Sequence, residues 1–297
     1  MDALKTLNKI NSLHVSLRHC RLQVPFHWFS DLQEISIDGT NGEYHTGTME
    51  NLAKMVAHSP QLNSINMKST VMLRTPLGKT QSLHQLFQYY SKDVPPLRLH
   101  RLVFDICLVR FDDITIPHLK YLTSLSLTDI KDTSDSTPTY SDGVNVDSEE
   151  ARAEQGRWGS SLQEIWNALM KADIFLEEIT VDVVVQNLIA YLASYSGLKI
   201  LNLTSRVFDK RISNDLAAQF YAKPLSNHVQ SLRRLDISAA YEGLWCVGEH
   251  NLSLISQCIN LKHLAVSVIL SQVEPAPPVG SSSRSAGRDI VVSVTIF

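Results

Sequence analysis

The segment Ser231-Leu232-Arg233-Arg234-Leu235-Asp236-Ile237 contains a leucine followed three and five positions later by apolar residues. We refer to this six-residue pattern, Leu-x-x-φ-x-φ with φ apolar, as the leucine motif. Because side chains alternate along a strand, positions 4 and 6 of the motif lie on one face. The motif occurs in eight in-phase copies, which begin at Leu32, Leu62, Leu99, Leu122, Leu176, Leu198, Leu232 and Leu261. Eight such copies are not expected by chance, even in a chain that is 44% hydrophobic.

Between the motifs the spacing of apolar residues changes from two toward 3.6, which is typical of amphipathic helices. The segments with this spacing are 52–56, 83–90, 162–169, 188–195 and 252–259. A strand followed by a helix, repeated along the chain, predicts a parallel sheet covered by helices. We therefore predict an α/β solenoid in which stacking of the repeats buries the leucines. An earlier repeat is predicted at Val15, Leu17, Cys20 and Leu22, with Ser12 in the first position.

Successive motifs begin between 22 and 54 residues apart, so most repeats carry insertions. We predict one continuous array over residues 1–270. Residues 131–157 are acidic and poor in apolar residues, and are predicted to form a disordered insertion. Residues 271–297 read as a Pro/Ser/Gly-rich linker and an apolar C-terminal tail. That tail either pairs with an edge strand or is an artefact of reading-frame prediction.

The composition restricts the classes of partner. The net charge of −3 provides no large positive field, so nucleic-acid binding is disfavoured. The chain contains no apolar run of membrane-spanning length and no signal-peptide pattern at its start, so we expect no membrane association and a cytoplasmic or nuclear location.

Motifs that carry chemistry are incomplete. Gly78-Lys79-Thr80 resembles the end of a phosphate-binding loop, but position 73 is Leu where that motif requires Gly. Cys246, His250, Cys258 and His263 do not follow a zinc-ligand spacing. We therefore expect no metal, no cofactor and no enzymatic activity.

The outward positions of the motif predict the binding surface. If positions 1, 4 and 6 face the core, positions 5 and 7 face outward, and the resulting surface is polar and mildly acidic. Acidity is greatest around residues 177–182, so we predict a protein partner with a basic segment. The candidate contact residues are Asp38, Lys68, Asp105, Glu177, Glu178, Asp182, Asn202, Arg234 and Asp236.

Segments such as Leu198-Lys-Ile-Leu-Asn-Leu203 and Pro96-Leu-Arg-Leu-His-Arg-Leu-Val-Phe104 resemble the leucine-rich-repeat regions of F-box proteins, especially the divergent fungal ones. This resemblance implies a horseshoe with strands on the concave face and a role in substrate recognition for a ubiquitin ligase. Leu162-Gln-Glu-Ile165 lacks the proline expected in an F-box. Binding to Skp and cullin subunits is therefore expected only if an F-box lies outside this chain. The alternative is a ribonuclease-inhibitor-like or GTPase-regulating repeat protein.

Overall fold

The structure is a computed structural model of the 297-residue chain. It describes residues 10–17, 24–40, 47–69, 82–130, 162–205, 209–269 and 292–296. The predicted acidic insertion at 131–157, the linker at 271–291 and the Gly78-Lys79-Thr80 segment lie outside these residues. The chain divides into two compact units, an N-terminal unit, Met1–Phe175, and a C-terminal unit, Leu176–Phe297.

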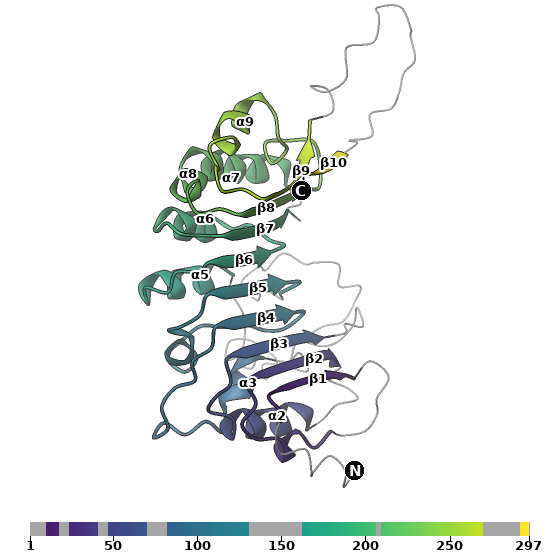
Figure 1. Cartoon of the computed structure of the whole chain (residues 1–297), viewed down its shortest axis with the longest axis vertical. Coiled ribbons are helices and arrows are strands. Elements are labelled where there is room, and N and C mark those ends of the chain that lie inside the picture. The colour runs from purple at the N-terminus through teal and green to yellow at the C-terminus, as the bar shows by residue number, and fades with distance from the viewer. Residues whose placement is uncertain are drawn as a thin grey trace, which may run out of the picture. The chain divides into compact units, whose positions relative to one another are not determined.

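The N-terminal unit contains a parallel sheet whose strands follow one another in chain order (Figure 1). Each strand after the first contains positions 3 to 7 of one leucine motif, so neighbouring motifs pair position for position. The five strands are β1 (Ser12–Ser16), β2 (Glu34–Thr40), β3 (Ser64–Ser69), β4 (Arg101–Asp105) and β5 (Ser124–Thr128).

The C-terminal unit repeats this arrangement with β6 (Glu178–Val181), β7 (Ile200–Ser205), β8 (Arg234–Ala239) and β9 (His263–Val268). A further strand, β10 (Val292–Ile296), pairs with β9 in the antiparallel direction. The C-terminal tail therefore pairs with an edge strand, which was one of the two alternatives left open by the sequence. This pairing satisfies the backbone groups that β9 would otherwise expose.

The predicted inward positions of the motif form the core of both units. In seven of the eight copies, the residues at positions 1, 4 and 6 are all buried, and Leu102, Phe104, Ile179 and Leu235 are 0% exposed. Burying a leucine-sized side chain contributes about 1.5–3 kcal/mol, so these columns provide most of the stabilisation of each sheet. In the last copy the burial is incomplete, because Leu261 and Leu264 are only half-buried.

The predicted first repeat exists, but its alignment is shifted by two residues. In β1, Leu13 pairs with Ile35 and Val15 pairs with Ile37, so Leu13 and Val15 occupy positions 4 and 6. The prediction had placed Val15 and Leu17 there. A shift of two residues leaves the same side chains on the same face, so the apolar pattern could not distinguish the two alignments.

Within each unit, a forked backbone hydrogen bond connects successive motifs. The carbonyl oxygen of Lys199, at position 2, accepts hydrogen bonds from the N–H groups of Arg233 and Arg234, at 2.8 and 3.1 Å. Asn63 bonds to His100 and Arg101 in the same way. The position 2 carbonyls that accept such paired bonds belong to Asn11, Gln33, Asn63, His100, Glu177, Lys199 and Arg233. The backbone hydrogen bonds therefore recur with the same period as the apolar residues of the motif.

Helices connect most of the strands. The predicted helices correspond to α2 (Thr48–Ala57), α3 (Leu83–Phe87), α5 (Leu162–Lys171), α6 (Gln186–Ala193) and α9 (Glu249–Ile255). In the C-terminal unit α6 contacts α7 and α8, so three helices pack together on one side of the strands (Figure 1).

The prediction missed two helices between β7 and β8, namely α7 (Lys210–Ala222) and α8 (Pro224–His228). The side chain of Asp209 caps α7 by accepting hydrogen bonds from the N–H groups of Arg211 and Ile212. Pro224 occupies the first turn of α8, where a proline is tolerated.

Candidate functional site

On the N-terminal unit, three of the predicted contact residues lie side by side on the exposed face of the sheet. Strand register places Asp38 on β2 beside Lys68 on β3, and Lys68 beside Asp105 on β4. The row ends at Thr128, whose hydroxyl donates a hydrogen bond of 2.9 Å to the Asp105 carboxylate. Because a cation lies between two carboxylates, this row carries little net charge.

On the C-terminal unit, Asn202 and Asp236 are register partners on β7 and β8. The Asn202 amide donates a hydrogen bond of 2.9 Å to the Thr180 hydroxyl. The Nε and Nη2 atoms of Arg234 donate to one oxygen of the Asp236 carboxylate, at 2.9 and 2.6 Å. The Nε2 atom of His263 lies 3.0 Å from the other oxygen. Asp236 is therefore held by groups of its own sheet.

The acidic region predicted around residues 177–182 is weaker than expected. The Glu177 carboxylate forms an ion pair of 2.7 Å with the Lys199 ammonium. Asp182 is 4% exposed, so the prediction that its side chain faces outward is wrong. Asp182 follows the last residue of β6, Val181, and the alternation of a strand does not extend to it. Glu178 remains on the sheet face, in register with Ile200 on β7.

Basic residues gather where β7, β8 and β9 begin, and of these sequence reasoning selected only Arg234 as a contact residue. Lys199, Arg233 and Lys262 occupy position 2 of three successive motifs, and Arg234 and His263 occupy position 3 of the last two. We call these five residues the basic edge. The forked hydrogen bonds bring their backbones together, since Lys262 donates its N–H to the Arg233 carbonyl at 2.8 Å. Glu177 was the only position 2 residue among the predicted contacts, although the basic residues at position 2 of the last three motifs can be read from the sequence.

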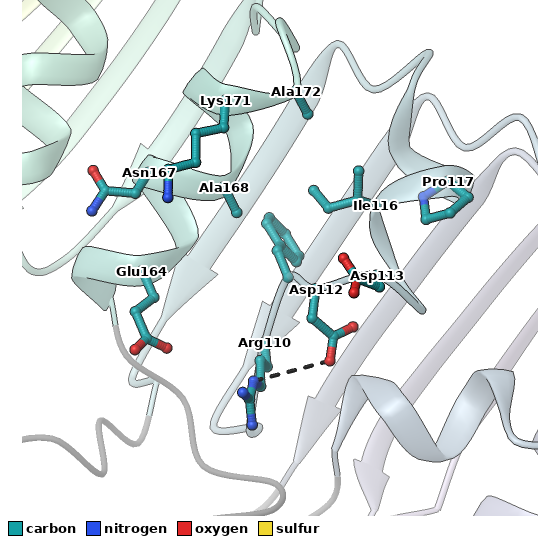
Figure 2. Close-up of a pocket in the computed structure, with 11 residues that line it drawn as sticks. Arg110, Asp112, Asp113, Ile116, Pro117, Glu164, Asn167, Ala168, Lys171 and Ala172 are labelled. Carbon is teal, nitrogen blue, oxygen red and sulfur yellow. Dashed lines mark ion pairs between the residues drawn. The ribbon is translucent and has the colours of Figure 1, made fainter.

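A hollow of about 610 Å³ lies in the N-terminal unit between α5 and the loop that follows β4. In this loop a single short 3-10 helix, η3 (Ile116–Leu119), takes the place of an α-helix. Figure 2 shows Glu164, Asn167, Ala168 and Lys171 of α5 opposite residues of the loop. Apolar residues, including Ile116 and Ala168, and charged residues of both signs line the hollow. This mixture favours no particular class of ligand.

Asp112, at the side of this hollow, has a structural role. Its carboxylate lies 2.7 Å from Nε2 of His84 and accepts hydrogen bonds from the N–H groups of Ile114 and Thr115. Burial alone would raise the pKa of Asp112, but the hydrogen bond from His84 and the backbone donors outweigh it and lower the pKa. Arg110 lies 4.0 Å from the same carboxylate (Figure 2). These contacts fix the loop that follows β4.

The cysteines and histidines near the C-terminus contact other groups. The Cys246 thiol donates to the Tyr241 carbonyl at 3.6 Å, and the His250 ring lies 3.0 Å from the Leu244 carbonyl. Over the residues that the structure describes, no three His, Cys, Asp or Glu side chains are grouped so that they could hold a metal ion.

No protein-family model matches this chain, and no curated protein matches it. Within the described ranges, the structure contains no helix with the length and apolar character needed to cross a membrane.

Proposed function

We propose that this protein is a protein-binding repeat module whose contact surface is the exposed face of its parallel strands. The observation that supports this proposal is the register of the motifs. Position 5 of one motif pairs with position 5 of the next in both units, for example Ser36 with Asn66 and Asn202 with Asp236. Polar side chains from distant parts of the sequence thus form continuous rows, which is how repeat proteins present extended binding surfaces.

The finer architecture that we propose is a leucine-rich-repeat solenoid with the strands on a concave face. The buried leucine columns and the forked bond at position 2 support this assignment, because both features recur with the motif. By analogy with F-box proteins that carry such repeats, the module would recognise a substrate of a ubiquitin ligase. Skp and cullin subunits would bind only through an F-box outside this chain. We propose that the protein itself is not an enzyme and that it acts in the cytoplasm or nucleus.

Capture of partners by two matched variants tests this proposal. Thr204 and Ser238 are exposed register partners on β7 and β8, so Thr204→Arg with Ser238→Arg places two bulky cations on the strand face. Ala190→Arg with Ala218→Arg places the same residues on exposed positions of α6 and α7. The tagged full-length chain and both variants are incubated with native cell extract, and bound proteins are identified by mass spectrometry.

We expect the strand-face variant to lose a partner that the helix variant retains. Circular dichroism confirms that both variants are folded. Retention of every partner by the strand-face variant, together with loss from the helix variant, would contradict the proposal. Recovery of Skp and cullin subunits by this chain would support the ubiquitin-ligase assignment and would contradict the expectation that they bind only through an F-box outside it.

A further inference from the structure

We infer that the basic edge, formed by Lys199, Arg233, Arg234, Lys262 and His263, binds an acidic segment of a partner protein. This inference deepens the proposed function and depends on it. It also reverses the charge of the partner that the sequence predicted.

The first argument is the arrangement of the cations, which come from neighbouring repeats. Adjacent strands lie about 4.8 Å apart, and a backbone hydrogen bond joins Lys262 to Arg233 directly. The side chains of Arg234 and His263, which are register partners on β8 and β9, are already bridged by the Asp236 carboxylate. Like charges opposite one another at neighbouring positions of a sheet are destabilising. An anionic group placed between Arg233 and Lys262 would relieve this repulsion.

The second argument is the distribution of carboxylates around the basic edge. Glu177 pairs with Lys199, and Asp236 contacts both Arg234 and His263. Arg233 and Lys262 take part in none of these ion pairs, and both side chains are exposed. Two exposed cations, which immediately precede β8 and β9, therefore remain available for carboxylates of a partner.

The third argument concerns the class of partner. A single-stranded nucleic acid is usually bound through aromatic side chains on which its bases stack. Positions 3, 5 and 7 of β7 to β9 carry no Phe, Tyr or Trp, and the single ring among them, that of His263, contacts Asp236. The basic edge is also short, because it spans three strands. An acidic peptide needs only a few carboxylates, spaced like the cations of neighbouring strands. It therefore fits the basic edge better than a single-stranded nucleic acid does.

Fluorescence anisotropy with a labelled peptide of ten glutamates tests the inference, using the full-length chain at low ionic strength. The test variant is Arg233→Glu with Lys262→Glu. The matched control is Lys120→Glu with Lys171→Glu, which makes the same change in net charge at exposed positions of the N-terminal unit. A milder variant, Arg233→Gln with Lys262→Gln, removes the two charges without reversing them.

We expect the charge-reversal variant to bind the peptide at least about tenfold more weakly, the glutamine variant to be intermediate, and the control to change by less than about twofold. Binding should also weaken as salt is added. Equal losses in the test variant and the control, or no binding by the unmodified chain, would overturn the inference. Tighter binding of a ten-nucleotide single-stranded DNA, or of a ten-lysine peptide, would also overturn it.

These results are separable from the test of the proposed function. If a captured partner is lost on substitution of Thr204 and Ser238 but the glutamate peptide does not bind, the protein-binding role stands and the acidic partner is excluded. If no partner is captured but the peptide binds at Arg233 and Lys262, the anion site stands without the proposed role.

Discussion

The Nδ1 atom of His228 accepts a hydrogen bond from the backbone N–H of Leu198, which lies 30 residues earlier, at 3.4 Å. Its Nε2 atom lies 3.0 Å from the Leu192 carbonyl. His118 has the equivalent role in the N-terminal unit, where its Nδ1 atom accepts from the N–H of Leu97 at 3.0 Å. A nitrogen that accepts a hydrogen bond cannot also carry a proton, so both folded contacts require neutral rings.

We predict from these contacts that acidification destabilises the protein. Burial lowers the pKa of His118 to about 4 and lowers that of His228, whereas both rings titrate near their ordinary value of 6.5 when unfolded. The stabilising contribution of the neutral rings is therefore complete above about pH 6.5 and is lost as the pH falls below that value, for His118 down to about pH 4. For His118 the loss is at most about 3 kcal/mol.

Urea unfolding between pH 4 and pH 7 measures this effect. The variant His118→Gln should have a lower free energy of unfolding at pH 7 and a weaker dependence on pH below 6.5. An identical pH profile for the variant and the unmodified protein would show that His118 does not contribute.

A second prediction concerns the leucine columns. Leu235 is 0% exposed and Leu252 is 56% exposed. Leu235→Ala removes buried methyl groups and leaves a cavity, so it should lower the free energy of unfolding by about 2–5 kcal/mol. Leu252→Ala should change it by less than about 0.5 kcal/mol. Urea titrations of the two variants provide the comparison, and equal effects would argue against the assigned orientation of β8.

A third prediction concerns a buried polar contact in the C-terminal unit. The indole Nε1–H of Trp245 donates a hydrogen bond of 3.1 Å to the Ser213 hydroxyl, and both residues are buried. Ser213→Ala would leave this donor unsatisfied and should cost about 1–3 kcal/mol. The control is Ser226→Ala, at an exposed position of α8. It should lower the free energy of unfolding by less than about 1 kcal/mol, which is roughly the net contribution of one exposed hydrogen bond. Thermal unfolding of both variants distinguishes these outcomes.

A fourth prediction concerns Cys107, which is 1% exposed. Burial raises the pKa of its thiol to about 12, and its Sγ atom donates to the Asp105 carbonyl at 3.4 Å. Because the thiolate is the reactive form, Cys107 should resist alkylation by iodoacetamide at pH 8 in the folded protein. The same residue should react readily in urea. Mass spectrometry of the Cys107 peptide measures both rates, and rapid labelling of the folded protein would contradict the prediction.

The core of both units could be predicted from the sequence because apolar and polar residues alternate along each strand. Positions 4 and 6 must alternate with polar residues if a strand is to bury one face, and Ile179 and Val181 on β6 do so. The start of β1 could not be predicted, because a shift of two residues preserves this alternation. α7 was missed although Leu216, Ala217 and Phe220 have helical spacing and Asp209 provides a cap.

The contact surface was less predictable from the sequence because its electrostatics depend on register. Asp38 and Asp105 were counted as acidity, yet the strand between them places Lys68 beside both. Asp236 was likewise counted as an available carboxylate, whereas Arg234 and His263 contact it. The in-phase motifs already predict that Lys68 lies between the two aspartates, whereas the contacts of Asp236 become visible only in the structure.

The forked hydrogen bond at position 2 explains how this chain tolerates such variable repeat lengths. At each step within a unit, two successive N–H groups, such as those of Arg233 and Arg234, bind one carbonyl of the preceding motif. A residue inserted between positions 1 and 4 would move these two N–H groups out of line with the carbonyl. A proline at position 2 or 3 would remove one of the two donors. Residues inserted after the strand leave the forked hydrogen bond intact. The motif therefore keeps a constant length and backbone geometry. The segments that connect successive motifs can be lengthened, shortened or replaced by other sequences.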